Sequence, residues 1–156
     1  MKRIIIDQDK CDGCKNCSIA CMQAHSDPKA ETVYALDLLD PKNEARHTIV
    51  NNRKDGYIPV FCRHCAVPDC VGACMSGALK KDPASGHVQY DEKRCGVCFM
   101  CVMSCTYGNV KPDKVTRTKI LKCDFCKDDN EEPNCVKLCP RKAIHVEEVN
   151  VGGVAV

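Results

Sequence analysis

Apolar residues are distributed along this chain in short segments, with little of the periodicity that marks a long amphipathic helix. The alternation of apolar and polar residues predicts five short strands, over residues 2–7, 57–61, 87–91, 115–121 and 143–147. Residues 18–24 can form a short helix, and Pro68 can begin another. The chain is therefore expected to fold from many small elements.

Four groups of four cysteines follow the first four predicted strands, and we call them quartets I to IV. Quartets I and III have the spacing C-x₂-C-x₂-C-x₃-C, quartet II has C-x₂-C-x₄-C-x₃-C, and quartet IV has C-x₂-C-x₈-C-x₃-C. Gly13 in quartet I allows a close backbone approach. Strand, cysteine loop and short helix thus form an internal repeat. The members are Cys11, Cys14, Cys17 and Cys21 (I); Cys62, Cys65, Cys70 and Cys74 (II); Cys95, Cys98, Cys101 and Cys105 (III); Cys123, Cys126, Cys135 and Cys139 (IV).

The composition indicates that something other than a large apolar core stabilises the fold. Sixteen of 156 residues are cysteine, whereas the chain has no tryptophan, three phenylalanines and four tyrosines. Disulfides or metals are the usual substitutes for a core in such chains. Only three isoleucines precede Asp7, so the start resembles no signal peptide, and no apolar run is long enough to span a membrane. A cytoplasmic location, where thiols stay reduced, is expected and favours metal.

The cysteine spacing favours iron–sulfur clusters over zinc. A loop with a cysteine at every third position can reach three corners of one [4Fe–4S] cubane, and the fourth cysteine binds the neighbouring cluster. Zinc ribbons instead use two C-x₂-C pairs about 15–20 residues apart. A thioredoxin-like interpretation is excluded because no C-x₂-C pair stands alone. A structural zinc protein remains the alternative.

The charge balance argues against nucleic acid as a partner. The formal net charge is +2. Each thiolate-bound [4Fe–4S] site adds about −2, so four sites would bring the chain to about −6. A mildly acidic protein without a basic block is a poor nucleic-acid binder.

Several polar residues near the quartets have two interpretations. Cations beside the cysteines either tune the cluster potentials by stabilising the reduced state or only solvate the loops; they are Lys10, Arg63, Arg94 and Lys122. The histidines are read as surface or core residues, because no cysteine is missing from a quartet; they are His25, His47, His64, His87 and His145.

Two stretches without cysteine are also ambiguous. Residues 26–55 form either a connecting insertion or a partner-docking element. The spacer within quartet IV is either a solvated loop or a docking patch for a basic partner; its acids are Asp128, Asp129, Glu131 and Glu132.

The four quartets, over roughly residues 3–148, resemble the four-[4Fe–4S] electron-transfer subunits of multi-subunit oxidoreductases. That family includes the iron–sulfur subunits of dimethyl sulfoxide reductase, formate dehydrogenases and formate hydrogenlyase, the iron–sulfur protein partnering carbon monoxide dehydrogenase, and the small subunit of tungsten aldehyde oxidoreductases. This chain stops soon after quartet IV, without a membrane-anchoring helix. It is therefore most similar to the short members that serve carbon monoxide dehydrogenase or aldehyde oxidoreductase.

The resemblance implies an α+β fold of two interleaved ferredoxin-like modules around four clusters. One module would comprise residues 1–25 and 111–156, the other residues 56–110, with residues 26–55 as the connecting insertion. Quartets I and IV would share two clusters, and quartets II and III the other two. The implied ligands are Cys11, Cys14, Cys17 and Cys139 (cluster 1); Cys62, Cys65, Cys70 and Cys105 (cluster 2); Cys95, Cys98, Cys101 and Cys74 (cluster 3); Cys123, Cys126, Cys135 and Cys21 (cluster 4).

The function implied is electron transfer without catalysis, because full thiolate ligation leaves no open iron corner and no catalytic triad or phosphate-binding loop is evident. Single electrons would pass between a catalytic subunit, with carbon monoxide dehydrogenase favoured, and a downstream acceptor. The alternatives are a subunit of an aldehyde oxidoreductase, hydrogenase or formate dehydrogenase, and a free soluble polyferredoxin.

Overall fold

The computed structural model describes residues 1–26, 29–52, 56–127 and 132–149. The strands within these ranges are β1 (Lys2–Ile6), β2 (Thr48–Asn52), β3 (Gly56–Val60), β4 (Leu79–Lys81), β5 (Val88–Tyr90), β6 (Val110–Pro112), β7 (Ile120–Lys122) and β8 (Ile144–Glu148). The helices are α1 (Asn16–His25), α2 (Asp69–Gly72), α3 (Met100–Ser104) and α4 (Asn134–Lys137). Three single 3₁₀ turns complete the described elements: η1 (Gln8–Lys10), η2 (Val33–Ala35) and η3 (Glu92–Arg94).

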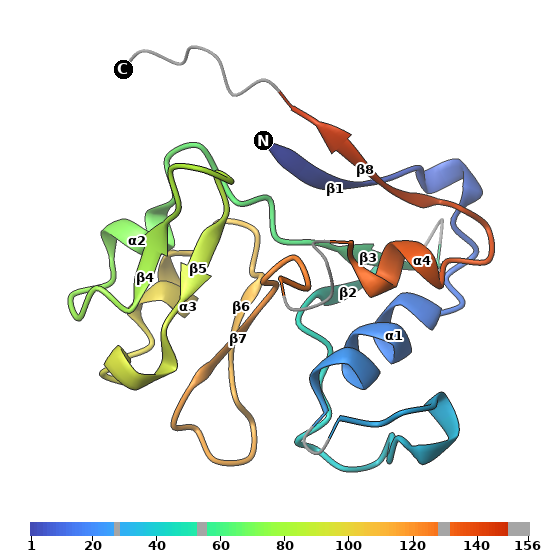
Figure 1. Cartoon of the computed structure of the whole chain (residues 1–156), viewed down its shortest axis with the longest axis horizontal. Coiled ribbons are helices and arrows are strands. Elements are labelled where there is room, and N and C mark those ends of the chain that lie inside the picture. Colours follow the sequence, from blue (N-terminus) through green and yellow to red (C-terminus); the bar gives the residue numbers. More distant parts are fainter. Residues whose placement is uncertain (27–28, 53–55, 128–131, 150–156) are drawn as a thin grey trace.

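The strands pair as two-stranded antiparallel sheets, in the combinations β1–β8, β2–β3, β4–β5 and β6–β7. In the first sheet, Ile4 lies opposite Val146, so the beginning of the chain is joined to its end. Figure 1 shows β1 and β8 side by side. This long-range pairing places quartets I and IV in the same part of the molecule.

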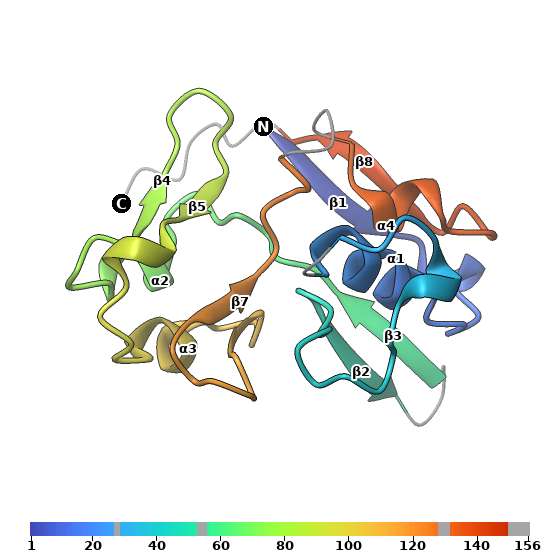
Figure 2. The ribbon, with the colours of Figure 1, turned by 60° about the horizontal axis from the view of Figure 1, so that its bottom comes forward.

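The elements gather into two lobes, seen in Figures 1 and 2. In one lobe α1 contacts α4, next to the β1–β8 sheet; in the other α2 contacts α3, next to β4 and β6. Each lobe has its own small core, and cysteines belong to both. The first core contains Ile4, Cys17, Phe61, Phe125, Cys135 and Ile144. The second contains Leu79, Val88, Cys101, Val110 and Ile120.

Most of the predicted elements are confirmed. Strands precede all four quartets as β1, β3, β5 and β7, the final strand is β8, and α1 covers the helix expected at residues 18–24. Alternation did not reveal β2, β4 or β6. Within the cysteine-free stretch between quartets I and II, β2 pairs along its whole length with β3.

The strand predicted over residues 115–121 is wrong in its first half, since β7 begins only at Ile120. The preceding residues form a turn around Asp113, whose carboxylate accepts hydrogen bonds from the Val115 N–H (3.0 Å) and the Thr116 hydroxyl. Local hydrogen bonds of this kind, made by a side chain to its own neighbours, compete with strand formation. Asp82 builds the same kind of turn with Ser85 between β4 and β5.

Three acids of the quartet IV spacer, at 128, 129 and 131, and the tail from residue 150 lie outside the described residues. The remaining spacer acid, Glu132, lies 3.5 Å from Lys137 Nζ. Among the described helices, none has the length and apolar character required to cross a membrane.

Candidate metal centres

All four C-x-x-C loops share one backbone feature. The residue before the second cysteine has a positive φ in each: Gly13 (70°), His64 (44°), Val97 (55°) and Phe125 (63°). A left-handed residue in such a turn directs successive backbone N–H groups to one side, which makes an anion-binding concavity. The four loops are therefore shaped alike, whatever side chain occupies this position.

Glycine is required at only one of the four positions. A Cβ on Gly13 would lie 3.0 Å from the carbonyl oxygen of Tyr57 in β3. The close backbone approach expected at Gly13 is thus confirmed, and the partner is the neighbouring strand.

The structure places twelve of the cysteines around three cavities. Each cavity is lined by three cysteines of one quartet and a single cysteine of another. The sets are Cys11, Cys14, Cys17 and Cys139; Cys62, Cys65, Cys70 and Cys105; and Cys95, Cys98, Cys101 and Cys74. In each case the fourth cysteine of a quartet lies apart from the other three.

The other four cysteines are also neighbours. Burial is the main cause that raises the pKa of the Cys135 thiol, and the nearby thiols of Cys123, Cys21 and Cys126 raise it further. Cys21 comes from α1, whereas the other three belong to quartet IV. All sixteen cysteines are within the described residues, and none of them forms a disulfide bond.

Burial makes many of these thiols poor candidates for ionisation without a metal. It raises the pKa of Cys17, Cys70 and Cys101 to about 11 in each case. A metal ion reverses this effect, because coordination deprotonates the thiol outright. The buried thiols are therefore suited to a metal cluster rather than to reaction as free thiolates.

The fourth cysteines of quartets I to III each accept a backbone hydrogen bond at sulfur. The donors are Arg46 N to Cys21 Sγ (3.3 Å), Leu79 N to Cys74 Sγ (3.4 Å) and Asn109 N to Cys105 Sγ (3.4 Å). Such bonds stabilise a thiolate and are among the features that set cluster potentials.

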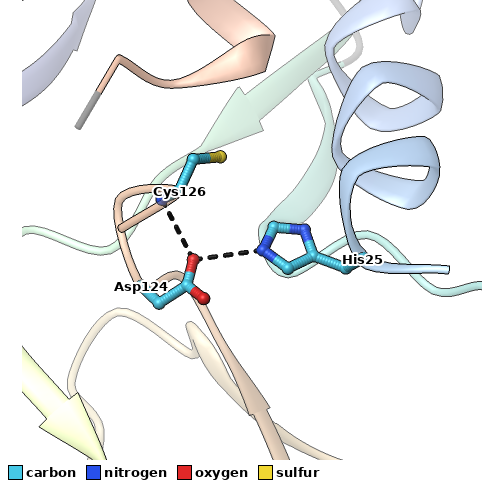
Figure 3. Close-up of side chains that lie close together, drawn as sticks. All are labelled: His25, Asp124 and Cys126. Carbon is cyan, nitrogen blue, oxygen red and sulfur yellow. Dashed lines mark hydrogen bonds and ion pairs between the residues drawn. The ribbon is translucent and has the colours of Figure 1, made fainter. Parts of the chain in front are cut away.

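His25, Asp124 and Cys126 lie close together (Figure 3), and the charged network to which they belong also reaches Cys21. His25 donates from Nδ1 to the Cys21 carbonyl (2.8 Å) and from Nε2 to Asp124 Oδ1 (3.1 Å). Asp124 also accepts the backbone N–H of Cys126 (3.1 Å), and Arg46 lies 2.6 Å from its other oxygen. The network joins α1, the 26–55 segment and the quartet IV loop.

The electrostatics of this network favour charge separation. Burial opposes ionisation of the Cys21 thiol, but hydrogen bonds from His25 and His47 outweigh it and lower the pKa to about 6. Burial likewise opposes a charged His25, but Asp124 and Cys21 raise its pKa to about 10. His25 thus belongs to a polar network that the sequence did not reveal, whereas His47 and His64 are buried, in agreement with the expectation of core histidines.

Sequence comparison assigns the protein to a family. Residues 54–149 match the 4Fe-4S dicluster domain. The protein belongs to this family. It is 30% identical over 151 residues to the uncharacterized ferredoxin MJ0265 of Methanocaldococcus jannaschii, covering 96% of this chain and 75% of that protein. It is therefore an iron–sulfur protein of the ferredoxin type.

Other members are subunits of larger enzymes. The chain is 34% identical over 149 residues to the beta subunit of NADH-dependent phenylglyoxylate dehydrogenase from Aromatoleum evansii, covering 95% of this chain and only 31% of that subunit. It is 34% identical to one chain of the anaerobic dimethyl sulfoxide reductase from Escherichia coli, over 89% of this chain and 69% of that one. Against a chain of the active site complex BamBC of benzoyl coenzyme A reductase, the TM-score is 0.51 with 26% identity, covering 94% and 76% of the two chains.

The residues present fit the [4Fe–4S] clusters of a dicluster-domain protein. Sixteen thiols, three cavities lined by four cysteines each, and left-handed cysteine loops are what such clusters need. The cations near the cysteines differ in burial: Lys122 is 4% exposed, whereas Lys10, Arg63 and Arg94 lie on the surface. Arg63 stacks on the ring of Tyr107, at 4.2 Å from its centroid.

Sequence reasoning missed three residues of the charged network. His25 follows Cys21 by four positions on α1, a spacing that places two side chains on one helix face. Asp124 directly follows a quartet IV cysteine. Both signals could have been noticed, but nothing local marks Arg46, which is 78 positions from Asp124.

Proposed function

We propose that this protein holds four [4Fe–4S] clusters and transfers single electrons as a subunit of a multi-subunit oxidoreductase. The observation that best supports this proposal is that each of three cavities is lined by the four cysteines that one cluster is expected to bind. Cys21 with Cys123, Cys126 and Cys135 would complete cluster 4, which their mutual influence on the Cys135 thiol supports. The bound clusters would supply the one-electron carriers; the chain supplies their ligands, burial and spacing.

The neighbouring thiols support a single row of sites in the order 1, 4, 2, 3. Cys17 of cluster 1 acts electrostatically on Cys135 of cluster 4, and Cys62 of cluster 2 acts on Cys123 of cluster 4. The ligands of clusters 2 and 3 pack around one core in the second lobe. Exposed ligands occur only at the two ends of this row among the sixteen cysteines, all of which are described: Cys14 at cluster 1 and Cys98 at cluster 3. These ends are suited to electron entry and exit.

We further propose that the two ferredoxin-like modules, residues 1–25 with 111–156 and residues 56–110, form most of the two lobes, although Phe61 belongs to the first core and Ile120 to the second. The β1–β8 sheet and the α1–α4 contact support the first. The β6–β7 hairpin lies where the modules join, because its Ile120 packs with Leu79 and Val88 of the second core.

A catalytic oxidoreductase subunit is the proposed partner. Support comes from the similarity to a chain of dimethyl sulfoxide reductase and to a chain of an active-site complex. None of the relatives named above is a partner of carbon monoxide dehydrogenase, so that pairing stays a prediction beside aldehyde oxidoreductase, hydrogenase and formate dehydrogenase. A free polyferredoxin is the second candidate, favoured by the similarity to MJ0265. We place the protein in the cytoplasm, where sixteen thiols would stay reduced.

Metal analysis of the anaerobically purified protein tests cluster binding. We expect a brown protein with about sixteen irons and as many sulfides per chain, since each cubane holds four of each. A colourless protein with about four zinc ions would contradict the proposal and favour the structural zinc alternative.

Affinity purification of the tagged chain from its own organism tests the subunit role. A catalytic oxidoreductase subunit that co-purifies in a fixed ratio supports it. An isolated monomer that carries clusters and reduces soluble acceptors would favour the free polyferredoxin.

A further inference from the structure

A series of hydrogen bonds crosses the junction between quartets II and IV. Lys122, just before the first cysteine of quartet IV, donates from Nζ to the carbonyl of Val88 (2.7 Å). The N–H of Val88 in turn donates to Nδ1 of His64 (2.9 Å), within the first loop of quartet II. Lys122 is 4% exposed and His64 only 1% exposed. The junction therefore holds a buried cation and a buried imidazole that share one residue, Val88, as their backbone partner.

The hydrogen bond from Val88 determines which nitrogen of His64 carries the proton. Nδ1 accepts a backbone N–H, so the neutral ring must carry its proton on Nε2. A protonated ring has hydrogens on both nitrogens and could not accept this bond, so the observed contact requires a neutral ring. His64 therefore presents one N–H donor, at Nε2.

That donor is buried and lacks a partner among the described residues. A buried polar group without a hydrogen bond costs about 1–3 kcal/mol, so it is rare in native proteins. His64 lines the same cavity as Cys62, Cys65, Cys70 and Cys105. The unpaired donor thus lies at the wall of the site proposed for cluster 2, where sulfur atoms would be the acceptors.

Buried positive charge is concentrated at the two inner sites. Lys122 directly precedes Cys123 of cluster 4 and donates from Nζ to the Cys123 carbonyl (2.7 Å) as well as to Val88, which lines the cavity of cluster 2. Lys81 donates to the carbonyls of His64 (3.2 Å) and Cys65. Two acids are near these sites: Asp124 is paired with Arg46 and His25, and Asp69, which lines the cavity of cluster 2, is exposed to solvent.

The outer sites differ, because the cations beside them are on the surface; Lys15 and Arg141, which line the cavity of cluster 1, are both exposed. Lys10 precedes quartet I and is paired with Asp7 at 2.7 Å; Arg94 precedes quartet III. Solvent and salt screen such exposed charges far more than buried ones.

We propose that His64 Nε2 donates a hydrogen bond to a sulfur atom at cluster 2, and that Lys122 and His64 hold the inner clusters 2 and 4 at higher reduction potentials than the outer clusters 1 and 3. The inference rests on the proposed four-cluster function. Positive charge and N–H donors stabilise the reduced state of a cluster because it is the more negative one. An electron therefore resides preferentially in the middle of the row.

The test is a potentiometric titration of the anaerobically loaded full chain, followed by EPR. At the wild-type midpoints of the inner clusters, Lys122→Met raises their ratio of oxidised to reduced form at least tenfold, equivalent to about 59 mV for one electron. The outer clusters change less than threefold. The matched control, Arg94→Gln, removes an exposed cation from the same position of quartet III and changes every cluster less than threefold.

The signals are assigned with the exposed ligands. Cys14→Ser and Cys98→Ser alter the signals of clusters 1 and 3, so the two signals that neither variant alters belong to the inner clusters. The potentials of these two must shift in Lys122→Met. Equal shifts of all four clusters, or shifts confined to the outer ones, overturn the inference.

Two substitutions of His64 test the hydrogen bond itself. Phenylalanine keeps a planar ring but removes the donor, whereas glutamine keeps both a donor and an acceptor for Val88. We expect His64→Phe to lower the potential of cluster 2. We also expect it to lack, already in H₂O, one proton coupling of the electron–nuclear double resonance spectrum that the wild type loses only on transfer to D₂O. His64→Gln restores both. Equal potentials of cluster 2 in His64→Phe and His64→Gln overturn the proposed hydrogen bond.

The outcomes separate the inference from the function on which it rests. A wild-type chain without iron ends the proposed function itself. A wild-type chain with four clusters, together with an unchanged Lys122→Met titration, overturns only the inference. If Lys122→Met fails to incorporate its clusters, the comparison of His64→Phe with His64→Gln decides.

Discussion

The inner cysteine loops, residues 62–65 and 123–126, and the outer loops, residues 11–14 and 95–98, have the same spacing and the same left-handed turn. Their surroundings differ. At the equivalent position the inner loops carry His64 and Phe125, which are buried, and the outer loops carry the partly exposed Gly13 and Val97. The spacing therefore specifies which cysteines can bind a cluster, whereas burial specifies how strongly nearby charges act at that site.

Packing strengthens this contrast. His64 and Phe125 pack edge to face with centroids 6.3 Å apart, and the ring of His87 packs at a tilt against both, at 4.6 and 4.3 Å. The inner loops are thus part of the structure that joins the lobes. The outer loops contain the exposed cysteines Cys14 and Cys98 instead.

The largest effect would come from removing the iron. Cysteines form part of both cores, and the chain has few large apolar residues to replace them. We expect anaerobic chelation to unfold inner and outer regions together, because metal-binding energy is folding energy in such domains. Far-UV circular dichroism measures the loss. A junction that stayed folded without iron would show that packing alone maintains it.

Single ligand substitutions should separate the regions. Cys135→Ser removes a buried cysteine, the proposed ligand of inner cluster 4, and is expected to lower the iron content by about four per chain. Cys14→Ser removes an exposed cysteine, the proposed ligand of outer cluster 1, which water or the serine oxygen can replace, and is expected to cost at most about one iron. Iron analysis and thermal unfolding check both variants. Equal losses of iron in the two variants would contradict the difference between the inner and the outer loops.

The equivalent loop positions provide a comparison without loss of ligands. Phe125→Ala empties a buried site in the junction and should destabilise the protein by about 3–5 kcal/mol. Val97→Ala removes two methyl groups from a partly exposed position and should cost less than about 1 kcal/mol. The shift of the anaerobic denaturation midpoint measures both costs.

The smallest effect concerns the two turns built on aspartate. Asp113→Asn should cost about 1 kcal/mol, by weakening the hydrogen bonds from Thr116 and Val115. Those bonds, chiefly the one from the Thr116 hydroxyl, hold the pKa of Asp113 below its usual value. Its contribution is therefore complete at neutral pH and is lost as the pH falls below about 4.

The thermal midpoint of Asp113→Asn at pH 7 measures this contribution. Asp82→Asn, in the matching turn between β4 and β5, is the control and should have a smaller effect, because Asp82 is less buried. An equal or larger loss in Asp82→Asn would show that burial does not decide the strength of these turns.

Much of the fold could be predicted because its signals are local. Strands before each quartet and the helix after Cys17 follow from alternation and from the cysteine spacing. The failure at residues 115–119 has a local cause as well, since Asp113 forms a turn where β-branched residues favour a strand. Strands of three residues, such as β4, are too short for alternation to mark them.

By itself, the sequence determined the chemistry: sixteen thiols at a spacing that suits cubanes, repeated four times. Only the tertiary structure decided which loops are buried together, that Lys122 is enclosed while Arg94 is not, and that His25 reaches Asp124 across 99 positions. The physical reason is the separation along the chain of the residues that set each property. Ligand spacing is set by a few covalent bonds, whereas burial and charge environment are the sum of contacts between distant segments.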